Sequence, residues 1–354
     1  MTAEAMDSKR DQKTGTQSKK GNPAAGAGRD YLFDNMRAIL IILVVWGHVL
    51  EPMRPAENSI KSIYYFLYFF HMPAMTFISG YFSKNLEKIR SNAFVTILIP
   101  YLILNVFNYL FKMYILQEPH FGFRFFRPLF GLWYLLALFL WKFFLKDLVR
   151  IRFLLPLSFL LGILSGYSKE FSEYLALGRV ICFLPFFLLG YYCTRENLEK
   201  LKGFPKWISF GIILAIGSLS VWIAKKNIFK VEVLYLRKPY PEASELQQML
   251  FRILVYVVAV AMIGALIILS DSRRSILSRL GASTMTVYVL HLFTVPLLEK
   301  FEILGERPYL YLVYSVFMTA LITLVYAHPL VIRIYDNVMD RLTGLILKNK
   351  SKES

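Results

Sequence analysis

An arginine and a histidine stand eleven residues apart, as Arg37 and His48, in the apolar stretch from Leu32 to Leu50. Ionisable side chains are costly inside a membrane and are functional candidates there by default. On an α-helix, eleven residues turn the chain by about 1100°, within about 20° of three full turns, and advance it by about 16 Å. Both side chains therefore share one face at different depths. Such a face can carry an anion-binding group at one depth and a proton acceptor at the other.

His48 has a carboxylate close by in the sequence. Glu51 follows it by three residues, about one helical turn. A carboxylate in this position can hold an imidazole in one tautomer, as it does beside catalytic histidines. We therefore interpret His48 as a general base and Glu51 as its orienting partner. The alternative is a histidine at the membrane interface that is solvated by headgroup water.

A second polar cluster lies in the next apolar stretch, where Pro73 follows His71 by two residues. Proline has no N–H, so we expect a kink that frees carbonyl groups, and such breaks are tolerated at membrane depth where they line a cavity. We therefore count His71 among the catalytic candidates. Ser79 lies eight residues further on and can face the same pocket. It can equally form, with Gly80, a small pair for close helix packing.

Polar residues also form a stripe on the third apolar stretch. Asn105, Asn108 and Lys112 are spaced i, i+3 and i+7, which places them on one helical face. A side-chain amide can donate to a developing oxyanion, so both asparagines are candidates for that role. Hydrogen bonding between helices is the alternative.

The composition is that of a membrane protein with several spans. Hydrophobic residues make up 56% of the 354 residues, and the formal net charge is +17. The mean hydropathy is +0.48. A soluble domain of this size has no use for so much apolar surface. The basic residues lie in short loops between apolar runs, which favours membrane orientation over nucleic-acid binding. No zinc spacing, Gly-rich phosphate loop or nucleophile elbow is present, and we expect no metal cofactor.

The apolar runs predict ten transmembrane helices and an all-α fold, because they are continuous rather than alternating. The runs are 32–50, 62–82, 93–116, 129–145, 151–166, 178–193, 207–224, 249–270, 283–298 and 309–331. We expect a disordered basic tail at 1–29, which can touch anionic membrane lipid, a membrane domain at 30–346 and a short tail at 347–354.

Loop charges predict the orientation. Lys and Arg are about twice as frequent on one side of the predicted bundle as on the other, which places both termini in the cytoplasm of a multi-pass plasma-membrane protein. Arg37 then lies toward the cytoplasm and His48 toward the outside. The longest external loop, about 225–248, is either a lid over an outward opening or a solvated connector.

At these residues the chain resembles the acyltransferase 3 family of integral membrane acyltransferases, especially its fucose 4-O-acetylase-like branch. Phe33 to His48 is similar to the family's Arg-x10-His motif, and Phe70 to Tyr81 is similar to its second-helix signature. Three weaker blocks also resemble the family: 128–135, 178–190 and 283–291. They contain Trp133, Arg179 and His291, which we add to Ser79, Asn105 and Asn108 as substrate or oxyanion candidates.

The resemblance implies O-acyl transfer, usually of acetyl from cytoplasmic acetyl-CoA to a hydroxyl of a cell-surface or lipid-linked glycan. Arg37, with Lys88 and Arg90 of the 83–92 loop, would then receive the phosphates of CoA. His48 would take the proton of the acceptor hydroxyl. A covalent acyl-enzyme through Ser79 or a histidine stays open.

Two other classes of protein compete with this interpretation. In a secondary transporter, His48 and Arg37 would line the path of a small solute, although no inverted repeat is visible. In a membrane haem protein, His48, His71 or His291 would be axial ligands.

Overall fold

The computed structural model describes residues 31–118, 128, 131–168, 174–301 and 307–347. The described residues all belong to one compact unit. These residues form helices and turns, with no strand among them. The all-α prediction is therefore confirmed. The tail predicted at 1–29, and the tail predicted at 347–354 except for Leu347, lie outside the described residues.

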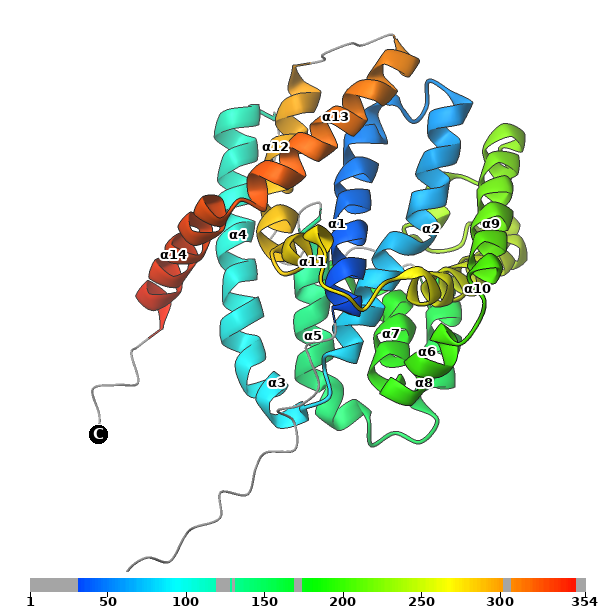
Figure 1. Ribbon diagram of the computed structural model, residues 1–354, viewed down its shortest axis with the longest axis horizontal. Helices are drawn as coiled ribbons and strands as arrows, with labels where there is room; N and C mark the ends of the chain where they lie inside the picture. Colours follow the sequence, from blue (N-terminus) through cyan, green and yellow to red (C-terminus); the bar gives the residue numbers. More distant parts are fainter. Residues whose placement is uncertain (1–30, 119–127, 129–130, 169–173, 302–306, 348–354) are drawn as a thin grey trace, which may run out of the picture. The chain divides into compact units, whose positions relative to one another are not determined.

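The described part of the chain contains α-helices and several single-turn helices (Figure 1). The α-helices are α1 (Leu32–Leu50), α2 (Asn58–Tyr81), α3 (Leu86–Ala93), α4 (Ile99–Leu110), α5 (Trp133–Leu148), α6 (Leu154–Leu164), α7 (Leu177–Tyr192), α8 (Arg195–Lys202), α9 (Lys206–Lys226), α10 (Glu245–Leu269), α11 (Ile276–Gly281), α12 (Thr284–Lys300), α13 (Pro308–Tyr326) and α14 (Pro329–Ile346). The short 3₁₀ turns are η1 (Glu51–Met53), η4 (Ser165–Tyr167), η5 (Tyr174–Ala176), η6 (Val231–Val233) and η7 (Glu242–Ser244), and the π-helical segments are η2 (Phe94–Leu98) and η3 (Phe111–Leu116).

Five helices in the described residues are long and apolar enough to cross a membrane. They are Leu32–Met53, Leu86–Leu116, Lys206–Lys226, Glu242–Leu269 and Pro308–Tyr326. The pair formed by α7 and α8 is bent by 91° and makes a sixth span if it counts as one. Each of the ten predicted runs overlaps a helix, but ten transmembrane helices and the side of the termini remain predictions.

Helices α1 and α2 occupy the interior of the described bundle. The α1 span is 56% buried, whereas the spans of α9 and α13 are each 28% buried. Helix α1 packs against α2, α11, α12 and α13, and α2 packs in turn against α7, α9 and α10 (Figure 1). Polar side chains on α1 and α2 are thus enclosed by other helices rather than by lipid, which is the arrangement expected of functional groups in a membrane.

The contact between α2 and α7 is close because a glycine of each helix lies against the backbone of the other helix. A Cβ atom on Gly80 would overlap the carbonyl oxygen of Phe187, and one on Gly190 would overlap the carbonyl oxygen of Phe77. Small residues let helix backbones approach in this way. The packing of Gly80 agrees with the helix-contact interpretation of that part of α2. It also brings the beginning of α7 next to the middle of α2, where His71 lies.

The segment between α9 and α10 is folded onto the bundle. Tyr65 donates to the carbonyl of Phe229, and Tyr240 donates to the carbonyl of Ile163 at 2.8 Å. Arg252 of α10, which is only 5% exposed, donates to the carbonyls of Gly162 and Lys238 and to the hydroxyl of Ser165. The segment predicted at 225–248 as an external loop is therefore anchored to the bundle by hydrogen bonds, and it is called the cover below. Its position outside the membrane stays a prediction.

Candidate functional site

His48 and Glu51 meet where α1 passes into η1. The Nδ1 atom of His48 lies 3.8 Å from Oε2 of Glu51, an ion-pair distance that is longer than a hydrogen bond. The helical turn that the sequence predicted between them is therefore present. Catalytic contacts of this kind are often long before substrate binds.

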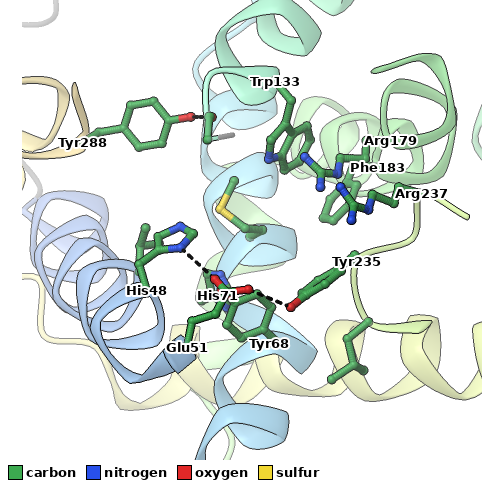
Figure 2. A pocket seen from close by; sticks show the side chains of 14 residues that line it. His48, Glu51, Tyr68, His71, Trp133, Arg179, Phe183, Tyr235, Arg237 and Tyr288 are labelled. Atoms are coloured by element: carbon green, nitrogen blue, oxygen red, sulfur yellow. Dashed lines mark hydrogen bonds and ion pairs between the residues drawn. The ribbon is translucent and has the colours of Figure 1, made fainter. Parts of the chain in front are cut away.

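Two cavities meet at this pair. The first, here called the arginine cavity, has a volume of about 290 Å³ and lies between α1, α2, α7 and the segment before α10 (Figure 2). It is lined by Val44, His48, Glu51, Tyr68, His71, Met72, Gly131, Trp133, Arg179, Phe183, Leu234, Tyr235, Arg237 and Tyr288. The second, here called the lysine–glutamate cavity, has a volume of about 460 Å³. It is lined by His48, Glu51, Pro52, Asn108, Lys112, Glu118, His291, Leu292, Val295, Pro296 and Glu299.

Three of the five histidines of the chain converge here. The rings of His48 and His291 are 5.3 Å apart between centroids, and His71 lines the arginine cavity beside His48 (Figure 2). In both His71 and His291, Nδ1 faces the carbonyl four residues earlier, at 2.6 Å and 3.1 Å. A carbonyl only accepts, so Nδ1 carries the proton and the neutral ring offers Nε2 as an acceptor.

The Nε2 atom of His291 has no hydrogen-bond partner among the described residues, although the side chain is fully buried. Asn108, which lines the same cavity and is 3% exposed, likewise has its Oδ1 atom without a partner in the described part of the chain. Buried polar groups are normally hydrogen-bonded, so two unsatisfied acceptors in one cavity indicate a site for a ligand that donates hydrogen bonds.

Glu51 is also held from the other side. Tyr235 donates to its Oε1 atom at 3.3 Å, and Nη1 of Arg54 lies 3.9 Å from the same oxygen. Tyr235 in turn accepts from Arg54 at 2.8 Å and bonds to the hydroxyl of Tyr64 at 2.9 Å. Burial, and next the negative charge of Glu51, raise the pKa of Tyr235 to about 12. The hydroxyl therefore stays protonated at physiological pH and keeps donating to Glu51.

Two guanidinium groups line the arginine cavity (Figure 2). That of Arg179 lies over the ring of Trp133 at 4.8 Å, and that of Arg237 lies over the ring of Tyr235 at 5.6 Å. Neither makes a hydrogen bond or an ion pair with any residue that the structure describes. The predicted candidates Trp133 and Arg179 are thus brought together, close to His48 and His71.

Arg37 lies toward the other end of α1. Its guanidinium is 3.7 Å from Asp34 and 4.5 Å from the ring of Phe82, just beyond α2. It faces α2 as His48 does, since His48 lies beside Tyr68 of that helix. Arg37 lines neither of the two cavities that contain His48. The two side chains that the eleven-residue spacing places on one face therefore do not line a common cavity among the described residues.

The other candidates for CoA binding lie near the Arg37 end. Lys88 is exposed on α3, and Arg90 forms an ion pair with Asp147 of α5 at 3.0 Å. Lys142 of α5 is close enough to Arg37 for their positive charges to repel. A binding role for Lys88 and Arg90 remains a prediction.

Ser79 and Asn105 lie outside both cavities. The hydroxyl of Ser79 bonds to that of Tyr134 at 2.7 Å. Asn105 is 2% exposed, and its Oδ1 atom has no partner among the described residues. Of the predicted pair on α4, the structure brings only Asn108 to the cavities of His48.

Sequence reasoning missed several residues of the site, among them Tyr68, Tyr235 and Glu299. Tyr68 precedes His71 by three residues and so shares its face, a signal that was available. Tyr235 sits in a loop without periodicity, and only the tertiary fold places it against Glu51.

Comparison with known proteins identifies the class. Residues 30–327 match the model of a protein family described as "Acyltransferase domain", Acyl_transf_3, and the chain belongs to this family. A stretch of 69 residues is 45% identical to the nodulation protein NolL of Sinorhizobium fredii, covering 18% of this chain and 19% of that protein. The chain thus spans about a fifth of the length of this curated relative in the match. No solved structure matches.

The family and the apolar helices together define a multi-pass membrane acyltransferase.

Proposed function

We propose that this protein transfers an acetyl group from cytoplasmic acetyl-CoA to a hydroxyl of a cell-surface or lipid-linked glycan in the plasma membrane. His48 is the general base, Glu51 orients it, and His71 assists in the same cavity. The observation that carries the proposal is the position of His48, beside Glu51 and at the junction of two cavities. A base that touches two cavities can meet two substrates, as group transfer between them requires.

The proposed step is direct acyl transfer. The acceptor hydroxyl gives its proton to Nε2 of His48 while its oxygen attacks the thioester carbonyl. The carbon–sulfur bond then breaks, and the leaving thiolate takes the proton back from the imidazolium. Glu51, opposite Nδ1, stabilises the imidazolium while it exists. Ser79 lines neither cavity and bonds to Tyr134, which supports direct transfer over an acyl-enzyme on Ser79.

Polar groups around His48 are assigned to two further roles, stabilising the oxyanion and binding a substrate. The side-chain amide of Asn108 can donate to the oxyanion of the tetrahedral intermediate. His291 cannot do so in its neutral form, because its only proton is given to the carbonyl of Val287. We assign His291 to binding a hydrogen-bond donor of one substrate. Asn105 lies farther away, so any effect on the oxyanion would act through packing around Asn108.

The donor is proposed to enter from the end of α1 that carries Arg37. Arg37 and Lys142, with Lys88 and Arg90 nearby, concentrate positive charge there, which suits the phosphates of CoA. The thioester arm would then have to cover the ~16 Å along α1 that separate Arg37 from His48. Membership of an acyltransferase family does not favour the transporter alternative.

The direct test uses the purified protein in detergent with acetyl-CoA labelled in the acetyl group. Label should pass to an added glycan preparation from the cell surface, and free CoA should appear in equal amount. The proposal would be overturned in favour of transport if the label stays on CoA when the glycan preparation is present and the protein moves a solute across the membrane of proteoliposomes.

The proposed orientation has its own test. A cysteine at Lys230, in the cover between α9 and α10, should react with an impermeant reagent in intact cells when Cys193 is replaced by serine. A cysteine at Glu199 of α8 should react only after lysis. The reverse pattern would place the termini outside the cytoplasm.

A further inference from the structure

We infer that the arginine cavity selects an acceptor that carries an anionic group, phosphoryl or carboxylate, next to the hydroxyl that is acylated. The anion would bind between Arg179 and Arg237. This inference rests on the proposed acyl transfer and names the class of its acceptor.

The first observation is that both arginines are uncompensated by the described residues. Arg252, a third arginine nearby, makes three hydrogen bonds, to Gly162, Ser165 and Lys238. Arg179 and Arg237 make none with the residues that the structure describes. A guanidinium presents five N–H donors and is always charged, so two of them beside one cavity leave many donors and two positive charges unsatisfied. An anion is the ligand that supplies both acceptors and charge.

The second observation is that the two guanidinium groups are held in place. Each lies over an aromatic ring, Trp133 for Arg179 and Tyr235 for Arg237. Figure 2 shows them next to each other on one side of the cavity, with His48 and Glu51 on the opposite side. Stacking orients the plane of a guanidinium and leaves its N–H edge for a ligand. Oriented arginines bind phosphate or carboxylate in a bidentate manner.

The third observation concerns which substrate the anion belongs to. Arg237 comes from the cover between α9 and α10, and Arg179 from the beginning of α7. Arg37 and Lys142, the cations proposed for CoA, lie toward the opposite end of α1. An anion held at the arginine pair therefore belongs to the acceptor. Because His48 lines the same cavity, a hydroxyl on the bound molecule lies within reach of the base.

The test first measures binding, without acyl transfer. The purified full-length protein is titrated in detergent with a hexose 1-phosphate, a hexuronate and the neutral methyl hexoside. Arg179→Gln and Arg237→Gln should each weaken binding of one of the anionic sugars by about tenfold or more, since each removes charge-assisted hydrogen bonds. The control Arg274→Gln removes the same charge from an exposed site between α10 and α11 and should bind as the wild type does. The two anionic sugars separate a phosphoryl from a carboxylate ligand.

Several results would overturn the inference. Equal binding of the neutral and anionic sugars would do so, as would unchanged affinity in both glutamine variants. If the variants instead weaken acetyl-CoA binding and leave the sugars unaffected, the anion belongs to the donor. The protein could bind the anionic sugars through both arginines and yet transfer no acyl group. That result would contradict the proposed function but would support the anion site. Transfer to a neutral glycoside at equal kcat/KM in wild type and variants would contradict the anion site alone.

Discussion

The arginine cavity and the lysine–glutamate cavity share His48 and Glu51 but differ in charge. The first adds two guanidinium groups that have no hydrogen-bond or ion-pair partner among the described residues. The second adds Lys112, already paired with Glu118 at 2.9 Å, and a further carboxylate at Glu299. Its unsatisfied groups are the neutral acceptors of His291 and Asn108. One cavity therefore suits an anion, and the other suits an uncharged group that donates hydrogen bonds.

This difference in charge fits two cavities that bind different substrates on either side of His48. Carboxylates repel phosphates, so the lysine–glutamate cavity is a poor site for the nucleotide of CoA. An uncharged amide or hydroxyl can bind there without that cost. Since the same imidazole borders both cavities, we propose that charge sorts the two substrates while His48 serves their reaction.

The largest expected effect is at the residue that the cavities share. His48→Ala should reduce acyl transfer by about 10²-fold or more, because a general base contributes that much to a rate. Folding should be unaffected, as judged by elution in gel filtration and thermal midpoint. His328→Asn is the control, since His328 only caps α14 by accepting from the N–H of Leu330. A folded His48→Ala protein with full activity would remove the base from the mechanism.

The next effect separates the carboxylates. Glu51→Gln should lower kcat about 10- to 100-fold, the usual range for groups that orient a functional imidazole. Glu299→Gln, at the exposed rim of the lysine–glutamate cavity, should change kcat by only a few-fold. The measurement is kcat for acetyl transfer at saturating acetyl-CoA. Equal losses in the two variants would show that negative charge near the site matters and that orientation by Glu51 does not.

A stability effect distinguishes Arg252 from the arginines of the cavity. Arg252→Met removes the hydrogen bonds to Gly162, Ser165 and Lys238, and hydrogen bonds of a charged group contribute about 1.5–3 kcal/mol each. The thermal midpoint of unfolding should fall clearly. Arg237→Gln should leave it unchanged or raise it, because an uncompensated positive charge is removed. A lower midpoint for Arg237→Gln than for Arg252→Met would contradict the structural contrast between them.

The smallest effect concerns Tyr235 and pH. Tyr235→Phe removes the hydrogen bond to Glu51 and should lower activity a few-fold. The pKa of Tyr235 is raised to about 12, so the neutral hydroxyl persists below that value and is lost only as pH rises through it. The ratio of wild-type to variant activity should thus stay constant from about pH 7 to about pH 11, which is about one unit above the ordinary tyrosine pKa. A ratio that falls toward one between about pH 9 and about pH 11 would show that Tyr235 ionises with the ordinary pKa of tyrosine.

Much of the fold could be predicted because apolar runs of helical length admit no other state in a membrane. Every predicted run overlaps a helix in the structure. Run lengths say little about bends, however. The run predicted at 309–331 is interrupted after Tyr326, and a separate helix, α14, begins at Pro329, where the proline suits a helix start.

For the site, the sequence predicted contacts between residues that are near each other along the chain. It did not predict contacts between residues that are far apart along the chain. The turn from His48 to Glu51 could be predicted, because residues three apart on a helix are neighbours. The spacing of Arg37 and His48 placed them on one face toward α2, yet it could not say which side chains fill the space between them. Tyr235 had no local signal, since its partners Glu51 and Tyr64 come from η1 and α2. Arg237 had none either, since it shares its cavity with Arg179 of α7.

The amino-acid sequence by itself determined an all-helical membrane protein with a polar stripe on its first helix, because hydropathy and the helical repeat are properties of neighbouring residues. The tertiary structure alone decided that three histidines meet, that His48 borders two cavities of different charge, and that two arginines from distant segments face one of them. The physical reason is that helix packing, through contacts such as Gly80 against Phe187, fixes which faces meet, and no repeat along the chain encodes that choice.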